Sequence, residues 1–179
     1  MNTHIQRSIE DALQGLAYWI SYRQVLCYNH HINEGALVAE LVVLLRAKLD
    51  SNFKIYNETK YNENSRERMD IEIVNKDGGR VAIIEVKRLL AGKTSINEDI
   101  DALTKAKRES RNVLCYLVVI SENVKKKVNA ASVKSDIFSK KGISPKKGIS
   151  PKVRILRSIK TLTNNNKVPK ANYCCLLKF

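Results

Sequence analysis

Residues 68–88, with the sequence RMDIEIVNKDGGRVAIIEVKR, contain two apolar-rich runs on either side of a DGG turn. This pattern predicts a β-hairpin, which commits the chain to building a sheet. Each run nevertheless carries charges that a buried strand avoids: Asp70 in the first, and Glu85 and Lys87 in the second. Because residues 81–86 (VAIIEV) are apolar on both faces of the strand, we expect Glu85 to lie near the core.

The turn of this hairpin decides which charged residues meet. A two-residue turn at positions 77–78 (DG) would place Asp70 directly opposite Glu85, with Cβ atoms about 4.5–5.5 Å apart. A turn at positions 78–79 (GG) would place Asp70 opposite Lys87, one diagonal step from Glu85. A three-residue turn without a bulge would break the alignment. In every register Glu85 and Lys87 share one face of their strand, because side chains alternate.

The pattern up to residue 121 predicts a mixed α/β sheet flanked by helices. Apolar residues three and four apart predict a helix at 5–26, and Asn33 is the expected N-cap of a second helix at 34–49. Ser95 and Glu98 have the capping-box spacing of a third helix. This helix precedes a continuous apolar run that is typical of a fully buried strand. A helix between two strands favours parallel pairing of the strands that it connects. The expected strands are 53–58, 69–74, 80–87 and 112–121.

Positive charge is concentrated in the last third of the chain. The net charge is +14; residues 1–120 hold 17 Lys/Arg and 16 Asp/Glu, whereas residues 121–179 hold 15 Lys/Arg and two acids. A polycationic segment of this kind favours a polyanionic partner, and nucleic acid is favoured over membrane because no amphipathic apolar face accompanies the charge. The alternative is a solubilising tail. The candidate DNA contacts are Lys125, Lys126, Lys127, Lys140, Lys141, Lys146, Lys147, Lys152 and Arg154.

The expected organisation is a single domain with an N-terminal helical segment (1–32), a central core (33–121) and a basic C-terminal extension (122–179). KGISPK occurs twice in tandem at 141–152, and its composition is typical of a flexible linker. The repeat contains SPKK, which resembles a short basic motif of histone tails that binds AT-rich minor grooves. Residues 124–138 are a possible short helix, and 171–179 a possible edge strand.

The chain has no apolar run of the roughly 18–20 residues that a membrane-spanning helix needs, and its start lacks the pattern of a secretion signal. We therefore expect a cytoplasmic protein. Four cysteines without CxxC spacing argue against a disulfide framework and a standard zinc ribbon. Buried thiols are the favoured interpretation; a site formed by Cys27, His30, His31 and Cys174 is the alternative.

A third acid is expected to join the hairpin charges from the second helix. Glu40 falls among Leu37, Leu41 and Leu44, so it points with the apolar stripe, where an acid is costly unless it is paired or binds a metal. Glu34 is the alternative, although acids favour the first turn of a helix for electrostatic reasons alone. Two facing carboxylates repel unless a cation lies between them, and hard oxygen ligands suit Mg²⁺.

This arrangement resembles the PD-(D/E)XK nuclease superfamily, which includes most type II restriction endonucleases. The resemblance lies in two acids and a lysine on a strand–turn–strand unit, preceded by a helix that carries a further acid. The resemblance covers residues 33–121. It implies a core of helix, three antiparallel strands, helix and parallel strand, that is, a restriction-endonuclease-like α-β-β-β-α-β fold. Met69 stands where the family's name-giving proline would be.

The resemblance also implies roles for individual residues. Asp70, Glu85, the main-chain carbonyl of Val86 and Glu40 would bind one or two Mg²⁺ ions. Lys87 would assist water activation, and we expect burial and nearby cations to lower its pKa toward that of a usable base.

The function implied is Mg²⁺-dependent hydrolysis of double-stranded DNA by a type II restriction endonuclease or a catalytic subunit of one. Cutting both strands would call for a homodimer or a partner subunit. The alternatives are a DNA-repair or junction-resolving nuclease of the same fold, and a non-catalytic DNA-binding protein. In the simplest alternative for the site, the charges are cross-strand ion pairs on a solvated face, where each contributes little.

Overall fold

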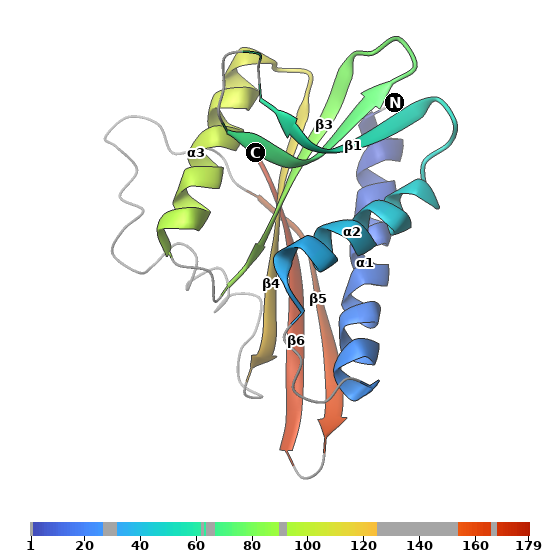
Figure 1. The fold of residues 1–179 in the computed structure, drawn as a ribbon, viewed down its shortest axis with the longest axis vertical. Coiled ribbons are helices and arrows are strands. Elements are labelled where there is room, and N and C mark those ends of the chain that lie inside the picture. The colour runs from blue at the N-terminus through green and yellow to red at the C-terminus, as the bar shows by residue number, and fades with distance from the viewer. Residues whose placement is uncertain are drawn as a thin grey trace.

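A computed structural model describes residues 2–26, 32–61, 63, 67–89, 93–124, 154–165 and 168–179. Three helices and six strands lie in these ranges (Figure 1). The helices are α1 (Asn2–Leu26), α2 (Glu34–Arg46) and α3 (Lys93–Glu109). The strands are β1 (Phe53–Lys60), β2 (Arg68–Asn75), β3 (Arg80–Arg88), β4 (Leu114–Val124), β5 (Arg154–Asn165) and β6 (Val168–Lys178).

The six strands form one mixed sheet in the order β1-β2-β3-β4-β6-β5. Neighbouring strands are antiparallel except β3 and β4, which pair in parallel and are joined through α3. The predicted mixed α/β class is therefore confirmed, as is the order of one helix, three strands, a helix and a parallel strand after residue 33.

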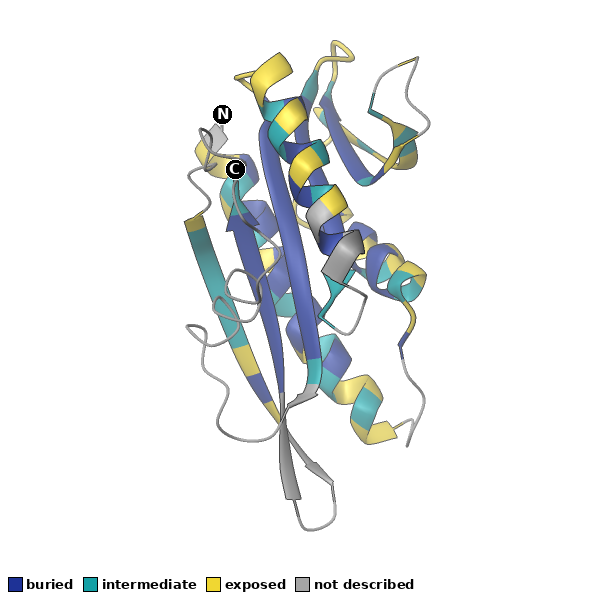
Figure 2. Ribbon diagram, turned by 90° about the vertical axis from the view of Figure 1, so that its left-hand side faces the viewer, coloured by how far each residue is buried: buried dark blue, intermediate teal, exposed yellow. Residues whose placement is uncertain are grey.

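Two apolar layers cover the two faces of the sheet. The larger packs α1 and α2 against one face, and the smaller packs α3 against the other. The central strands between these layers are buried, whereas the outer helix faces are exposed (Figure 2). Residues 113–121 are all buried, which confirms the prediction of a strand covered on both sides.

The helix ends follow the sequence closely but not completely. Asn33 is the N-cap of α2, and its side chain accepts a hydrogen bond of 2.7 Å from the amide of Ala36. The helix ends at Arg46, three residues earlier than predicted. Helix α3 begins at Lys93, so the predicted start at Ser95 is two residues late.

The prediction for the C-terminal segment was wrong in one respect. Residues 171–179 belong mainly to β6, which lies inside the sheet between β4 and β5 rather than at its edge. The edge strand on this side of the sheet is β5, which the sequence did not predict because basic residues interrupt its apolar pattern.

The extension between β4 and β5 (125–153) lies outside the described residues, and with it the tandem repeat, the possible short helix and eight of the nine candidate DNA contacts. The ninth, Arg154, is the exposed first residue of β5. No helix in the described part of the chain is long and apolar enough to cross a membrane. Cys115, Cys174 and Cys175 are buried free thiols, and Cys27 is not among the described residues.

Candidate active site

The β2–β3 hairpin sets the register of the charged residues through a loop and a bulge. Asn75 pairs with Gly79 across a three-residue loop, and Gly78 adopts a φ of 81°. Between the pairs Val74–Arg80 and Ile73–Ala82 the register shifts by one residue, so Val81 is a bulge residue in β3. The turn is therefore longer than the predicted two-residue turn.

The bulge restores the register that brings the acids together. The ladder beyond it runs to the pair Ile71–Ile84, and one further step places Asp70 opposite Glu85. Without the extra residue Asp70 would face Ile84, and Glu85 would turn to the other side of the sheet. Of the two pairings that the sequence left open, the ladder thus favours Asp70 opposite Glu85, although through a different turn.

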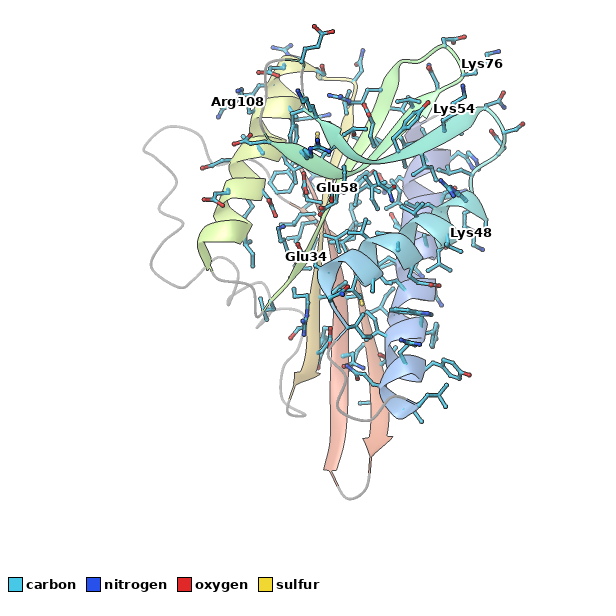
Figure 3. All side chains as sticks on the ribbon, in the orientation of Figure 1. Glu34, Lys48, Lys54, Glu58, Lys76 and Arg108 are labelled. Carbon is cyan, nitrogen blue, oxygen red and sulfur yellow. The ribbon has the colours of Figure 1, made fainter. Side chains whose placement is uncertain are left out.

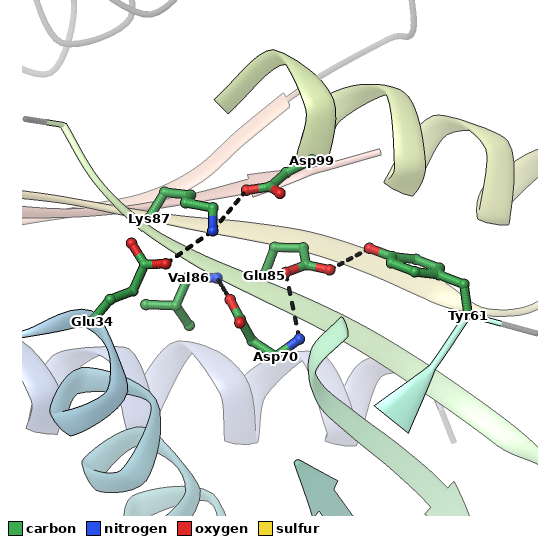
Figure 4. A network of polar contacts seen from close by, with 7 residues as sticks. All are labelled: Glu34, Tyr61, Asp70, Glu85, Val86, Lys87 and Asp99. Carbon is green, nitrogen blue, oxygen red and sulfur yellow. Dashed lines mark hydrogen bonds and ion pairs between the residues drawn. The ribbon is translucent and has the colours of Figure 1, made fainter. Parts of the chain in front are cut away.

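Backbone amides hold the two carboxyl groups at short range. Oδ2 of Asp70 accepts a hydrogen bond of 2.7 Å from the amide of Val86, and Oε2 of Glu85 lies 3.4 Å from the amide of Asp70 (Figure 4). Glu85 is only 3% exposed and Asp70 is half-buried. The acids therefore do not lie on a solvated face.

Lys87 lies beside this pair, between two helices. Its Nζ atom is 2.9 Å from Oε1 of Glu34 at the start of α2 and 3.5 Å from Oδ2 of Asp99 in α3. The lysine side chain is 14% exposed. A cation from β3 is thus held by acids from α2 and α3 (Figure 4).

A tyrosine and an arginine complete the network on the β1 side. The hydroxyl of Tyr61, the residue that follows β1, donates a hydrogen bond to Oε1 of Glu85. The guanidinium of Arg80 pairs with Glu72 and donates to the carbonyls of Tyr61 (2.8 Å) and Lys60 (3.3 Å).

Burial and like charge shift the pKa values of the acids upward. Burial and the neighbouring Asp70 raise the pKa of Glu85 to about 9. Burial also raises the pKa of Asp70, despite the hydrogen bond from Val86. Burial raises the pKa of Asp99 to about 6, against the opposing effect of Lys87. Without a cation, the carboxyl pair therefore keeps a proton at neutral pH.

The pKa of Lys87 moves opposite to the prediction. Burial lowers the pKa of the ammonium group, but the hydrogen bond with Glu34 and the charge of Asp99 more than offset this effect. The pKa therefore lies above its ordinary value, and Lys87 is a fixed cation rather than a base.

Helix α2 contributes Glu34 to the network rather than Glu40. Glu40 is half-buried, and its side chain makes no hydrogen bond or ion pair with another residue that the structure describes. The two acids are six residues apart, so they lie about a third of a turn from each other around the helix. The prediction that Glu40 points toward the hairpin charges was wrong.

Sequence reasoning did not find Asp99 or Tyr61. For Asp99 a signal existed, because it lies one residue before Ile100 of the apolar stripe of α3 and so borders the buried face. Tyr61 has no comparable signal, since its place depends on how β1 ends.

The donor set fits a hard divalent cation in part. Asp70 and Glu85 supply facing carboxyl oxygens in a largely buried position, and hard oxygen ligands of this kind suit Mg²⁺. Within the described ranges, however, no group of three or more Asp, Glu, His or Cys side chains is arranged to hold a metal ion. A bound Mg²⁺ would complete its shell with water, as Mg²⁺ usually does.

Comparison with protein-family models, with curated proteins and with solved structures yields no match for this chain.

Proposed function

We propose that the protein is a Mg²⁺-dependent endonuclease acting on double-stranded DNA, with a restriction-endonuclease-like core formed by residues 33–121. The observation that carries the proposal is the placement of Asp70 opposite Glu85 with Lys87 on the same face. Asp70 and Glu85 are too buried to be surface charges that form solvated ion pairs. Two adjacent acids in such a position cost stability unless a cation lies between them.

The chemistry follows from what each group can do. Asp70 and Glu85 would hold the ion, which lowers the pKa of bound water and stabilises the charge that develops on the phosphate. Val86 uses its amide to orient Asp70, and its carbonyl is the further ligand expected. Lys87 would hold the attacking water and a phosphate oxygen in place as an ammonium ion, without accepting a proton.

Glu34 and Asp99 would act on the reaction through Lys87. Each approaches the ammonium group from a different helix, and together they restrict where it can point. A long flexible side chain held in this way loses little further entropy when it contacts a phosphate.

Affinity for DNA would come largely from charge outside the site. The net charge of +13 in residues 121–179 favours binding to the phosphate backbone with strong salt dependence. The core adds exposed cations at its rim, among them Lys48, Lys54, Lys76 and Arg108 (Figure 3). These contacts would position DNA without reading its sequence.

Among nucleases, we favour a type II restriction endonuclease or a catalytic subunit of one. One site per chain would cut both strands only as a homodimer or with a partner subunit. A repair or junction-resolving nuclease is the second candidate.

The test is cleavage of supercoiled plasmid by the full-length protein with Mg²⁺, with EDTA, and with an Asp70→Asn variant. We expect nicked or linear product with Mg²⁺ only, and a decrease of at least about 100-fold in the variant. Absence of Mg²⁺-dependent cleavage would contradict the proposed activity. Equal cleavage by Asp70→Asn would contradict the site.

The substrate then separates the candidates. Discrete fragments from genomic DNA favour restriction, whereas cleavage of branched DNA alone favours a resolvase. Salt-dependent binding without any cleavage favours a non-catalytic DNA-binding protein on this fold.

A further inference from the structure

We propose that Tyr61 is a positioning residue for Glu85: its hydroxyl fixes the carboxyl orientation in which Glu85 and Asp70 bind the metal ion together. This inference rests on the proposed nuclease function and assigns a role at the same site. Tyr61 lies outside the motif residues and comes from the end of β1, a part of the chain to which the sequence assigns no role in the site.

The two oxygens of Glu85 have different partners. Oε1 accepts the hydrogen bond from Tyr61, and Oε2 lies near the amide of Asp70. The second contact is long at 3.4 Å, so the tyrosine provides the stronger restraint on the carboxyl group. With Oε1 held in this way, Oε2 is the oxygen on the side of Asp70, where a shared ion would bind.

Burial of the ring does not by itself require this hydrogen bond. Tyr116 and Tyr173 are buried more deeply, and their hydroxyl groups have no hydrogen-bond partner among the described residues. This fold therefore tolerates tyrosine hydroxyls without partners. The hydroxyl of Tyr61 is directed instead at an acid that is itself 3% exposed.

Arg80 fixes the position from which Tyr61 reaches the acid. Its guanidinium donates to the carbonyl oxygens of Tyr61 and Lys60 while it pairs with Glu72. These contacts tie the end of β1 to β2 and β3. The connection therefore runs from Arg80 through the backbone of Tyr61 to the carboxyl group of Glu85.

Because a group that orients a metal ligand typically alters metal affinity, the test measures binding in the absence of DNA. Full-length protein is titrated with Mn²⁺, which binds more tightly than Mg²⁺ would at such a site, and the free ion is followed by electron paramagnetic resonance. The variants are Tyr61→Phe and, as matched control, Tyr56→Phe, a residue of the preceding strand β1 that is 45% exposed.

We expect Tyr61→Phe to weaken Mn²⁺ binding about tenfold, and Tyr56→Phe to leave it unchanged. In cleavage assays, the Mg²⁺ concentration for half-maximal rate should rise similarly, while the rate at saturating Mg²⁺ changes by less than about threefold. A lower melting temperature of Tyr61→Phe with unchanged Mn²⁺ affinity would show a merely structural role and overturn the inference.

A double-mutant cycle tests the part played by Arg80. Arg80→Lys keeps a cation beside Glu72 but loses the fork that reaches two carbonyls. It should weaken Mn²⁺ binding in the wild-type background and have no further effect in Tyr61→Phe; fully additive losses would overturn the connection. Wild-type Mn²⁺ binding no tighter than that of Asp70→Asn would instead remove the metal site, and with it the proposed function.

Discussion

The amide nitrogen of Asp70 lies 3.4 Å from Oε2 of Glu85, so two acids from adjacent strands meet in a largely buried position. Because neither acid forms an ion pair with Lys87, whose ammonium group lies within reach of Glu34 and Asp99, the pair lacks a direct counter-ion among the described side chains. In the metal-free protein the pair therefore keeps a proton at neutral pH, and losing that proton would place two like charges side by side.

Replacing Asp70 should therefore abolish activity without lowering stability. Asp70→Asn keeps an oxygen that can accept from the amide of Val86, and it removes the charge that, together with burial, raises the pKa of Glu85 and forces it to take up a proton on folding. We expect the free energy of unfolding at pH 8 without metal to be unchanged or higher by up to about 1–2 kcal/mol, while cleavage is lost. Urea denaturation in EDTA measures the first effect; a clear loss of stability would contradict the unfavourable influence of Asp70 on Glu85.

Metal-free stability should fall as pH rises. Glu85 keeps its proton up to about pH 9 in the folded protein, whereas in the unfolded chain it loses it near its ordinary pKa of 4.5. Between these values the folded state binds more protons, so each pH unit costs up to about 1.4 kcal/mol per proton. The raised pKa of Asp99 contributes a loss of stability of the same sign up to about pH 6.

Melting temperatures in EDTA between about pH 5 and pH 9 check this expectation. Glu85→Gln provides the control, because it cannot ionise and should flatten the slope above pH 6. A slope as steep in Glu85→Gln as in the wild type would show that another group titrates.

Two acids of α2 should behave differently. Glu34→Gln weakens the restraint on Lys87, and we expect the cleavage rate at saturating Mg²⁺ to fall about tenfold. Glu40→Gln is the matched control on the same helix and should leave the rate unchanged. Plasmid cleavage rates of both variants test this prediction. A larger loss of rate in Glu40→Gln than in Glu34→Gln would show that Glu40 belongs to the site.

The turn of the hairpin depends on glycine at one position. Gly78 has a positive φ, and a Cβ atom there would meet nothing within 4 Å, so the cost of a side chain is conformational only. Gly78→Ala should lower the free energy of unfolding by about 1–2 kcal/mol, and Gly78→Asn by less. Equal stability of the Ala variant and the wild type by urea denaturation would contradict the three-residue loop.

The sequence predicted those parts of the fold that periodicity controls. Ile5, Ile9, Leu13, Leu16 and Ile20 of α1 are all fully buried at helical spacing, as their pattern indicated. Strand β5 escaped prediction because an edge strand needs no continuous apolar face. In β5, basic residues such as Arg157 bind acids of α1 rather than water alone.

The site was predictable where it is local and unpredictable where it depends on packing. Asp70, Glu85 and Lys87 follow from one hairpin. The choice between Glu34 and Glu40 depends on how α2 is rotated against the sheet. The upward shift of the Lys87 pKa depends on the hydrogen bond with Glu34 and on the charge of Asp99, which come from α2 and α3. Neither is set by local sequence pattern.

Val81, the bulge residue of β3, makes the spacing between the two acids less informative than it looks. Besides the three loop residues, the fourteen residues between Asp70 and Glu85 include one strand residue that pairs with nothing across the hairpin. A chain with thirteen could present the same carboxyl pair through a hairpin without a bulge. A search for distant relatives should therefore allow this interval to vary by one residue and anchor instead on Glu-x-Lys.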